Sequence, residues 1–347
     1  MQKTERTSWG HIWAEEMQAR FTRAGRLAIA ESWLSFWRSV VSQSLIAVVI
    51  ASTPFAVSSA AEMKVEQLSI DGRTREYVLF APAAGRQLPT ILALHGTLLD
   101  AKRTMVSMGL KELIDPERLV VVAPKAVAGQ WNDGRLLAAT LTWEADDVAF
   151  IRGLIGHLVD TGVSDPHRVY VTGFSNGGMM ALRLICEASD LIAAVGVVAA
   201  TFPLELVERC NQPRPTPVLV MNGTADPIVP YAGGALAFGG GQVLPTDETI
   251  NLLRTINRCT DTRRSGPLPH ADRNDGSYVM ISSWTNCGSG APVVLYRIQG
   301  GGHRIPGHRE GWPVTNLLLG KMNRDFEASY ALWSFFNDKK RVNSQAQ

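Results

Sequence analysis

The stretch Arg168-Val-Tyr-Val-Thr-Gly-Phe-Ser-Asn-Gly-Gly-Met-Met-Ala181 decides the fold. Residues 169–172 are a β-branched and aromatic run that predicts a buried strand, and residues 179–187 continue as a helix. Between them, residues 173–177 match G-x-S-x-G, a sharp strand-to-helix turn that holds a serine hydroxyl at the carboxyl edge of a sheet. We therefore expect Ser175 to be a nucleophile; the alternative is an ordinary glycine-rich turn.

Two downstream turns supply a carboxylate and then a histidine. Residues 217–222 predict a buried strand, and Asp226 lies on the loop that leaves it. Residues 292–298 predict another strand, which is followed by Gly300-Gly-Gly-His303. Three glycines before a histidine suit backbone that folds tightly around a reacting centre. Asp226 could instead only cap its own loop, as aspartate does in many turns.

Seven histidines compete for the role of base. His303 is favoured because it directly follows the strand and the glycines, and its rival is His308 in the same loop. His95 follows the strand predicted at residues 91–94 and opens His95-Gly-Thr97, which is typical of an oxyanion loop. The others lie in the leader, in a helical pattern, before a strand at its non-catalytic end and in a polar loop: His11, His157, His167 and His270.

A serine, an aspartate and a histidine in this order predict nucleophilic catalysis. The histidine would accept the serine proton, and the carboxylate would fix the tautomer of the ring and stabilise the cation that forms. The backbone N–H groups of Asn176 and Thr97 would stabilise the tetrahedral oxyanion, each contributing about 3 kcal/mol. The sequence has no HExxH, no Walker A loop and no dinucleotide fingerprint in strand–turn–helix context, so we expect neither a metal nor a cofactor.

Six motifs follow one another in an order that is typical of one family. They are Leu94-His-Gly96, Gln130-Trp-Asn-Asp133, Asp146-Asp-Val-Ala-Phe-Ile151, Gly173-Phe-Ser-Asn-Gly-Gly-Met-Met180, Asn222-Gly-Thr-Ala-Asp226 and Gly300-Gly-Gly-His303. As an ordered set, spanning about residues 64–338, they resemble the polyhydroxybutyrate depolymerase and feruloyl esterase-like group of secreted α/β-hydrolases. The resemblance implies an α/β-hydrolase fold, with a mostly parallel central sheet and helices on both faces.

The same resemblance implies a serine carboxylic-ester hydrolase that acts on short-chain, hydroxyacyl or feruloyl-type esters. It assigns Ser175 as nucleophile, Asp226 as acid and His303 as base. The group usually has a tryptophan two residues after the histidine, where this chain has Ile305. Ile305 and His95 are therefore pocket candidates, together with Trp312 as a replacement aromatic surface. The alternatives are a peptidase of the same fold, with an identical triad, and a non-catalytic binding protein, which usually loses a triad member.

Composition predicts one catalytic domain at residues 62–340, between a leader at residues 1–61 and a flexible tail at residues 341–347. The leader has six basic and four acidic residues, and the whole chain has a net charge of +2, so the remainder is neutral. A neutral domain without a basic stripe gives no support for nucleic-acid binding. A small-molecule or oligomeric ester is the expected partner.

The leader has the pattern of a signal peptide. Residues 44–57 form an apolar run of about 14 residues, which is short for a membrane span. Arginines precede this run, and Ser59-Ala-Ala61 offers small residues for cleavage. The charged segment is long, and a start at Met17 would shorten it. We expect a secreted or periplasmic protein with no stable membrane partner after cleavage; the alternatives are an anchor through residues 44–57 and a folded helix.

The four cysteines favour export. None has CxxC spacing, which argues against a zinc site. An even number in an exported chain predicts two disulfides, and the sequential pairing, Cys186–Cys210 and Cys259–Cys287, keeps each loop local. The alternative is four inert buried thiols.

Further patterns complete a mostly parallel sheet. A hairpin is predicted around Asp71-Gly72, strands at residues 119–122 and 192–198, and helices at residues 144–159 and 324–337. Acidic residues in the first turn of the former helix, Glu144, Asp146 and Asp147, suit its positive dipole end. Residues 232–245 and 262–276 are rich in glycine, proline or charge, and we expect them to be irregular and to border the site.

Overall fold

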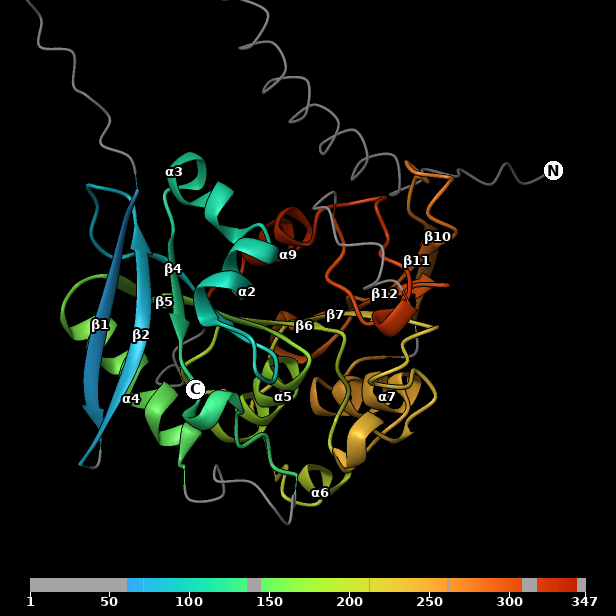
Figure 1. The fold of residues 1–347 in the computed structure, drawn as a ribbon, viewed down its shortest axis with the longest axis horizontal. Helices are drawn as coiled ribbons and strands as arrows, with labels where there is room; N and C mark the ends of the chain where they lie inside the picture. Colours follow the sequence, from blue (N-terminus) through green and yellow to red (C-terminus); the bar gives the residue numbers. More distant parts are fainter. Residues whose placement is uncertain are drawn as a thin grey trace, which may run out of the picture. The chain divides into compact units, whose positions relative to one another are not determined.

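The fold is built on one large sheet (Figure 1). The computed structural model describes residues 61–341 except residues 71, 136–144, 212, 261 and 308–316. Within these described residues the sheet has ten strands, in the order β1-β2-β4-β3-β5-β6-β7-β12-β11-β10. Residues 1–60 of the leader, the last six residues, Glu144, His308 and Trp312 lie outside the described residues, so the expectations placed on them stay predictions.

The six central strands of the sheet are parallel. They are β4 (Val120–Pro124), β3 (Leu88–Leu94), β5 (Ser164–Phe174), β6 (Ala194–Val198), β7 (Val218–Gly223) and β12 (Val293–Gln299). Antiparallel strands extend both ends: β1 (Glu62–Ile70) and β2 (Arg73–Ala81) beyond β4, and β11 (Tyr278–Trp284) and β10 (Arg264–Pro267) beyond β12. The carboxyl ends of parallel strands meet at one edge, where ligands bind in such sheets.

Helices cover both faces of the sheet (Figure 1). On one face lie α4 (Asp147–Asp160), α5 (Asn176–Ala188), the short α6 (Leu204–Val207) and α7 (Thr246–Ile256); on the other lie α2 (Ala101–Ser107), α3 (Ile114–Glu117) and α9 (Ala328–Phe336). Three-residue or four-residue 3-10 turns connect other segments: η1 (Leu110–Leu113), η2 (Val127–Gly129), η3 (Ala237–Gly239) and η4 (Gly288–Gly290). This layered arrangement confirms the predicted α/β-hydrolase architecture. Among the described residues, the helices lack the combination of length and apolarity that crossing a membrane requires.

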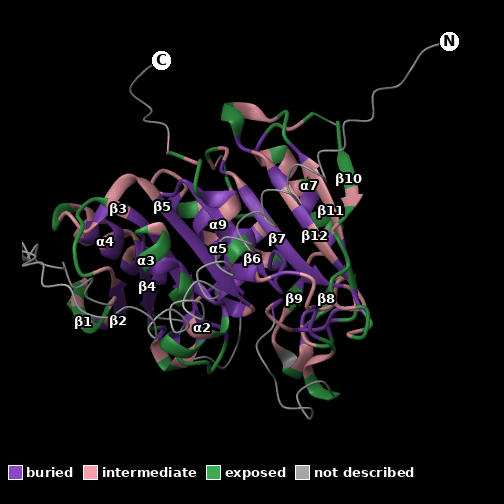
Figure 2. Ribbon diagram, turned by 90° about the horizontal axis from the view of Figure 1, so that it is seen from above, coloured by how far each residue is buried: buried purple, intermediate pink, exposed green. Residues whose placement is uncertain are grey.

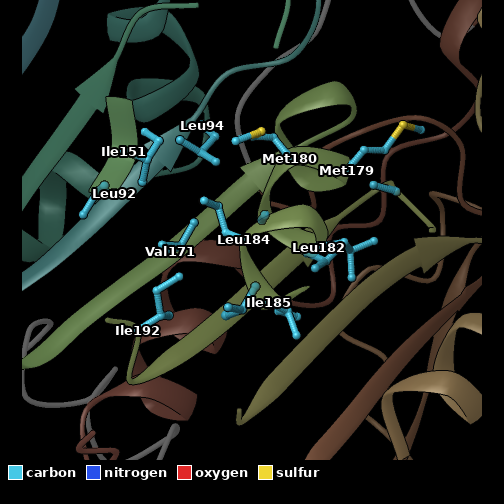
Figure 3. Packing of buried hydrophobic residues seen from close by; sticks show 14 of the residues in the cluster. Leu92, Leu94, Ile151, Val171, Met179, Met180, Leu182, Leu184, Ile185 and Ile192 are labelled. Carbon is cyan, nitrogen blue, oxygen red and sulfur yellow. The ribbon is translucent and has the colours of Figure 1, made fainter. Parts of the chain in front are cut away.

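Two apolar cores lie on the two faces of the sheet. The side chains of β3 alternate between them: Leu92 and Leu94 belong to one core, and Ile91 and Ala93 to the other. Figure 3 shows the first core, in which α5 packs over β3 and β5. Fully burying each large apolar side chain contributes about 1.5–3 kcal/mol. The central strands are buried on both faces, whereas β1 and β10 at the two margins carry exposed residues (Figure 2).

Two segments that the sequence predicts as irregular contain short strands. Residues 264–267, within 262–276, form β10 and pair with β11. Residues 232–245 contain the two-stranded pair β8 (Gly234–Ala235) and β9 (Gln242–Val243) around η3. The sequence-based expectation was wrong for both because partner strands, rather than local propensity, stabilise these strands.

Helix boundaries also differ from the sequence-based expectation. The helix after Ser175, α5, begins at Asn176, three residues earlier than predicted, because glycines follow the serine without breaking the helix. The closing helix α9 begins at Ala328 rather than at residue 324. The carboxylate of Asp325 instead accepts hydrogen bonds from the backbone N–H groups of Ala271 and Asp272, which holds this segment in a loop.

The two predicted disulfides are confirmed. Cys186 near the end of α5 is bonded to Cys210 after α6, and Cys259 after α7 is bonded to Cys287 after β11. The first bond links α5 to the loop after α6, and the second links the loops after α7 and β11. The described part of the chain has no free cysteine.

Candidate active site

Ser175 lies on a strained turn between β5 and α5. Its backbone angles are φ 56° and ψ −122°, a conformation that costs a residue with a side chain about 1–3 kcal/mol. A Cβ atom at Gly173 would lie 2.1 Å from the carbonyl oxygen of Gly177, and one at Gly177 would lie 2.2 Å from that of Leu94. The glycines of the motif are therefore required because backbone segments meet there.

Asp226, His303 and Ser175 form a continuous series of hydrogen bonds. His303 Nδ1 lies 2.7 Å from Asp226 Oδ2, and His303 Nε2 lies 2.9 Å from Ser175 Oγ. The carboxylate can only accept, so Nδ1 carries the hydrogen and the lone pair of Nε2 faces the serine. His303 is 5% exposed and Asp226 is 8% exposed. The structure thus brings together the three residues that the sequence singled out.

The carboxylate of Asp226 binds both its own loop and the histidine. Its Oδ1 accepts hydrogen bonds from the backbone N–H groups of Ile228 and Val229, at 2.8 Å each. Its Oδ2 remains for His303. The two readings of Asp226 from the sequence, a loop cap and a partner for histidine, are therefore compatible. The cap fixes the orientation of the oxygen that meets the ring.

The glycines before His303 admit a second backbone segment. A Cβ atom at Gly302 would lie 2.1 Å from the carbonyl oxygen of Leu319. The N–H of His303 donates to that same oxygen at 2.6 Å, and the N–H of Gly302 donates to Lys321 O at 2.8 Å. The ring of Phe174 lies 4.9 Å from the imidazole, measured between centroids. Backbone bonds and one aromatic contact thus orient the imidazole.

The two predicted oxyanion residues come from neighbouring segments. Asn176 is the first residue of α5, where backbone N–H groups have no partner within the helix. Thr97 is exposed on the loop that leaves β3. A Cβ atom at Gly96 would lie 3.3 Å from Ser175 Cβ, so this loop adjoins Ser175. The geometry is compatible with both residues facing one oxyanion, and that role stays a proposal.

His95 supports this loop and is not arranged as a surface for substrate. It is 1% exposed, its Nε2 accepts a hydrogen bond from Ala126 N at 3.0 Å, and its Nδ1 lies 2.8 Å from Gly96 O. This pattern requires a neutral ring with hydrogen on Nδ1. Burial lowers the pKa of His95 from its ordinary value, mainly by disfavouring the charged form. Both ring nitrogens are thus committed to backbone.

The other pocket candidates have less defined surroundings. Ile305 is half-buried and packs against the apolar core on the α9 face. Trp312 and the rival base His308 lie outside the described residues. Residues 232–245 contact the acid loop, because Ala237 N donates to Ile228 O at 3.1 Å.

Sequence reasoning gave no role to the residues after η2. Trp131, Asp133 and Arg135 are buried, and the first two bind the side chain of Asn176, the residue after Ser175. The only sequence signal was the motif Gln130-Trp-Asn-Asp133, which was part of the family resemblance but carried no chemistry of its own.

A parallel sheet that presents a serine on a strained turn, followed by an aspartate and a histidine from later strands, defines the α/β-hydrolase class. Residues 141–239 match the family model described as Phospholipase/Carboxylesterase. The chain is 32% identical over 275 residues to the putative esterase NocK of Nocardia uniformis subsp. tsuyamanensis, covering 76% of this chain and 79% of that protein. The chain belongs to the α/β-hydrolase esterases of the polyhydroxybutyrate depolymerase and feruloyl esterase-like group.

Two further comparisons cover smaller shares. Feruloyl esterase B of Piromyces equi is 32% identical over 187 residues, which cover 52% of this chain and 32% of that protein. The chain thus spans about a third of that relative's length. The crystal structure of a thermostable esterase aligns with a TM-score of 0.50 and 17% identity, covering 81% of this chain and 64% of the other. At that identity the likeness shows the fold alone.

Proposed function

We propose that this protein is a serine carboxylic-ester hydrolase, with Ser175 as nucleophile, His303 as base and Asp226 as the acid that orients it. The observation that carries the proposal is the continuous series from Asp226 Oδ2 through the imidazole to Ser175 Oγ, at 2.7 and 2.9 Å. It ends at a serine whose backbone is strained, as is common at catalytic residues.

Acylation begins when Ser175 Oγ attacks the ester carbonyl carbon and His303 Nε2 takes the hydroxyl proton. The carbonyl oxygen becomes an oxyanion, for which the backbone N–H groups of Asn176 and Thr97 are the proposed donors. Collapse of this tetrahedral adduct breaks the bond to the alcohol oxygen. His303 returns the proton to the leaving alcohol, and the acyl group stays on the serine.

Deacylation repeats these steps with water as the nucleophile. His303 takes a proton from water, and the hydroxide attacks the acyl-enzyme carbonyl carbon. Collapse of the second adduct releases the carboxylic acid and restores the Ser175 hydroxyl with the proton held by His303. Asp226 stabilises the imidazolium in both stages without itself taking a proton.

The substrates that we propose are short-chain, hydroxyacyl or feruloyl-type esters. The names of the relatives favour this class, since they include a feruloyl esterase and a poly(3-hydroxybutyrate) depolymerase. Ile305 occupies the position at which the family resemblance implies tryptophan. We therefore propose that soluble short esters are better substrates than solid polyester.

We also propose that the mature protein is secreted or periplasmic. The signal-like leader supports this location, with an anchor through residues 44–57 as the alternative. Two disulfides in the folded part favour an oxidising compartment. Sequencing the amino terminus of exported protein tests the predicted cleavage near Ala61.

The triad is tested by covalent labelling and by one substitution. A fluorophosphonate should label Ser175, and Ser175→Ala should lower kcat on p-nitrophenyl butyrate by about 10⁴- to 10⁶-fold without changing the melting temperature appreciably. A label on any other serine contradicts the assignment. A parallel panel of peptide amides tests the peptidase alternative, and absence of turnover on every substrate would favour the non-catalytic binding protein.

A further inference from the structure

The side chain of Asn176 forms hydrogen bonds with the backbone of Trp131, in the segment that follows η2. Its Oδ1 accepts a hydrogen bond from Trp131 N at 2.8 Å, and its Nδ2 donates to Trp131 O at 3.1 Å. The same Nδ2 donates to Asp133 Oδ2 at 2.6 Å. The Asn176 side chain thus pairs with both backbone groups of one residue and with a carboxylate, in a residue that is 2% exposed.

Asp133 is itself held in place by a buried arginine. Its Oδ1 accepts from Arg135 N at 3.2 Å and from Arg135 Nε at 2.9 Å, and its Oδ2 forms an ion pair with the guanidinium at 2.6 Å. Both side chains are at least nine-tenths buried. Such a pair is costly to break, because an unpaired charge would remain in the interior. The carboxylate that meets Asn176 therefore has a defined position.

Trp131 connects this segment to the other half of the proposed oxyanion hole. Its Nε1 donates to His95 O at 3.0 Å, and its ring lies 5.2 Å from the imidazole of His95, measured between centroids. The segment begins at Gly129, the last residue of η2, whose carbonyl accepts a hydrogen bond from Leu98 N at 2.8 Å. These contacts lie on either side of Thr97. The segment from Gly129 to Arg135 thus holds both the Thr97 loop and Asn176.

We propose that Asn176, through its side chain, and Asp133 are positioning residues that fix the two oxyanion donors relative to each other. This inference rests on the proposed function. The physical reason is that donors stabilise an oxyanion only within about 0.3 Å of the right distance. A displacement of about 1 Å can lower the rate about 100-fold. Neither side chain needs to touch the substrate.

The chain contains a matched control for this arrangement. Asn257, which is fully buried, makes the same number of bonds, with a backbone carbonyl in place of the carboxylate: Oδ1 accepts from Thr216 N at 3.0 Å, and Nδ2 donates to Thr216 O at 2.7 Å and to Ala291 O at 2.9 Å. Thr216 and Ala291 precede β7 and β12, at the end of the parallel sheet opposite the triad. Asn257→Ala therefore removes three buried hydrogen bonds far from the proposed active site.

The first experiment compares Asn176→Ala with Asn257→Ala. Alanine at residue 176 keeps the backbone N–H that is the proposed donor. We expect kcat on p-nitrophenyl butyrate to fall about 10- to 100-fold in Asn176→Ala, with KM within about 3-fold of wild type, because the loss is confined to the transition state. We expect Asn257→Ala to keep kcat within about 3-fold. Since each variant loses three buried hydrogen bonds, their melting temperatures should agree within about 3 °C.

The second experiment uses a mimic of the tetrahedral adduct, n-butylboronic acid. Its boron bonds to the serine oxygen, and a boron-bound oxygen occupies the place of the oxyanion. We expect its Kd to rise in Asn176→Ala by the same factor as kcat/KM falls. Asp133→Asn combined with Arg135→Met weakens the acceptor for Asn176 Nδ2 and leaves no unpaired charge in the interior, and it should shift both quantities in the same direction by about 3- to 10-fold. It provides the test if Asn176→Ala does not fold.

Equal kinetic losses in the Asn176 and Asn257 variants would overturn the inference, and so would a loss of kcat/KM without weaker boronate binding. A failure of the esterase proposal itself would give a different result, which is seen in the wild-type protein. In that case wild-type protein neither hydrolyses the ester nor is labelled at Ser175. Active wild type with an unaffected Asn176→Ala variant overturns the positioning role and leaves the triad proposal intact.

Discussion

At the scale of single residues, His303 and His95 show opposite uses of the same side chain. The imidazole of His303 bonds one carboxylate and one hydroxyl, both of which suit a ring that gains and loses a proton. The imidazole of His95 bonds two backbone groups, which require one fixed neutral tautomer. Environment rather than residue type therefore separates the proposed base from a structural histidine.

The choice between the two histidines after β12 is testable by substitution. We expect His303→Ala to lower kcat nearly as far as Ser175→Ala, and the double variant to be no worse, because both changes remove one shared step. His308→Ala should keep at least about a tenth of the activity, a loss of no more than about 1.4 kcal/mol in activation free energy. Steady-state kinetics on p-nitrophenyl butyrate measures all four variants. The opposite ranking of the histidines would assign the base to His308.

His95 predicts a dependence of stability on pH. Its pKa in the folded protein is lower than in the unfolded chain, so the unfolded chain binds the proton first as the pH falls. This contribution to stability is complete above the unfolded pKa of about 6.5 and is lost as the pH falls from there toward the folded pKa, at up to about 1.4 kcal/mol per pH unit.

The His95→Gln variant isolates this contribution. Glutamine does not titrate, and its amide oxygen can accept the hydrogen bond from Ala126 N. We expect the melting temperature to fall less between about pH 8 and pH 5.5 in the variant than in wild type, since all other titrating groups are shared. Equal slopes in the two proteins would mean that protonation of His95 does not destabilise the fold.

At the scale of elements, those that carry the triad were the easiest to predict. β7 is buried along its whole length, β5 is buried over residues 169–174, and β12 opens with the apolar residues 293–296, so each contains a short apolar run that the sequence shows. β11 and β10 lie at the margin, with only β11 between β10 and the rest of the sheet. β10 contains a glycine and a proline, and its pairing with β11 is a long-range contact that no local pattern encodes.

The two disulfides lead to predictions about thiol content, cysteine pairing and the free energy of unfolding. Protein from an oxidising compartment should have no free thiol after denaturation, and peptide mapping should recover Cys186–Cys210 and Cys259–Cys287. Each bond closes a loop for which chain entropy predicts about 3.5 kcal/mol of stabilisation. Cys259→Ala with Cys287→Ala should therefore lower the free energy of unfolding by about that amount while keeping activity. Four alkylatable thiols, or a crossed pairing, would contradict this prediction.

At the scale of the whole molecule, the site is assembled from loops that are far apart in sequence. The order serine, aspartate and histidine, each after a predicted strand, was enough to select the residues, because parallel strands end at one edge. The support beneath them could not be predicted in this way. The contact of Asn176 with Asp133 joins residues that are 43 positions apart and depends on how two loops pack.

Substrate preference also belongs to the whole molecule, because it depends on the shape of the entrance rather than on the triad. We expect wild type to have a higher kcat/KM on p-nitrophenyl acetate and butyrate than on a hydroxybutyrate oligomer, and not to clear solid polyester. Ile305→Trp adds an aromatic wall, and such contacts contribute about 1–3 kcal/mol to binding.

The Ile305→Trp variant should therefore change the ranking of a methyl hydroxycinnamate and the oligomer more than it changes turnover of the acetate ester. Relative kcat/KM values across these four substrates provide the measurement. An unchanged ranking would exclude residue 305 from the pocket, and clearing of solid polyester by wild type would refute the proposed preference for soluble esters.

The backbone bonds around His303 have a consequence for how this enzyme family can diversify. Gly302, His303 and Gly307 donate hydrogen bonds to the carbonyl oxygens of Lys321, Leu319 and Asn323, so the two ends of the intervening stretch are fastened side by side. For a stretch with fixed ends, doubling its length adds only about 0.6 kcal/mol of closure entropy. All three bonds lie within residues 302–307 and 319–323, so the anchoring of the imidazole depends on backbone there and not on the identity of side chains elsewhere in the loop. A base held by backbone bonds in this way lets the surrounding side chains be varied, by evolution or by design, to reach new ester specificities while the proposed base keeps its position.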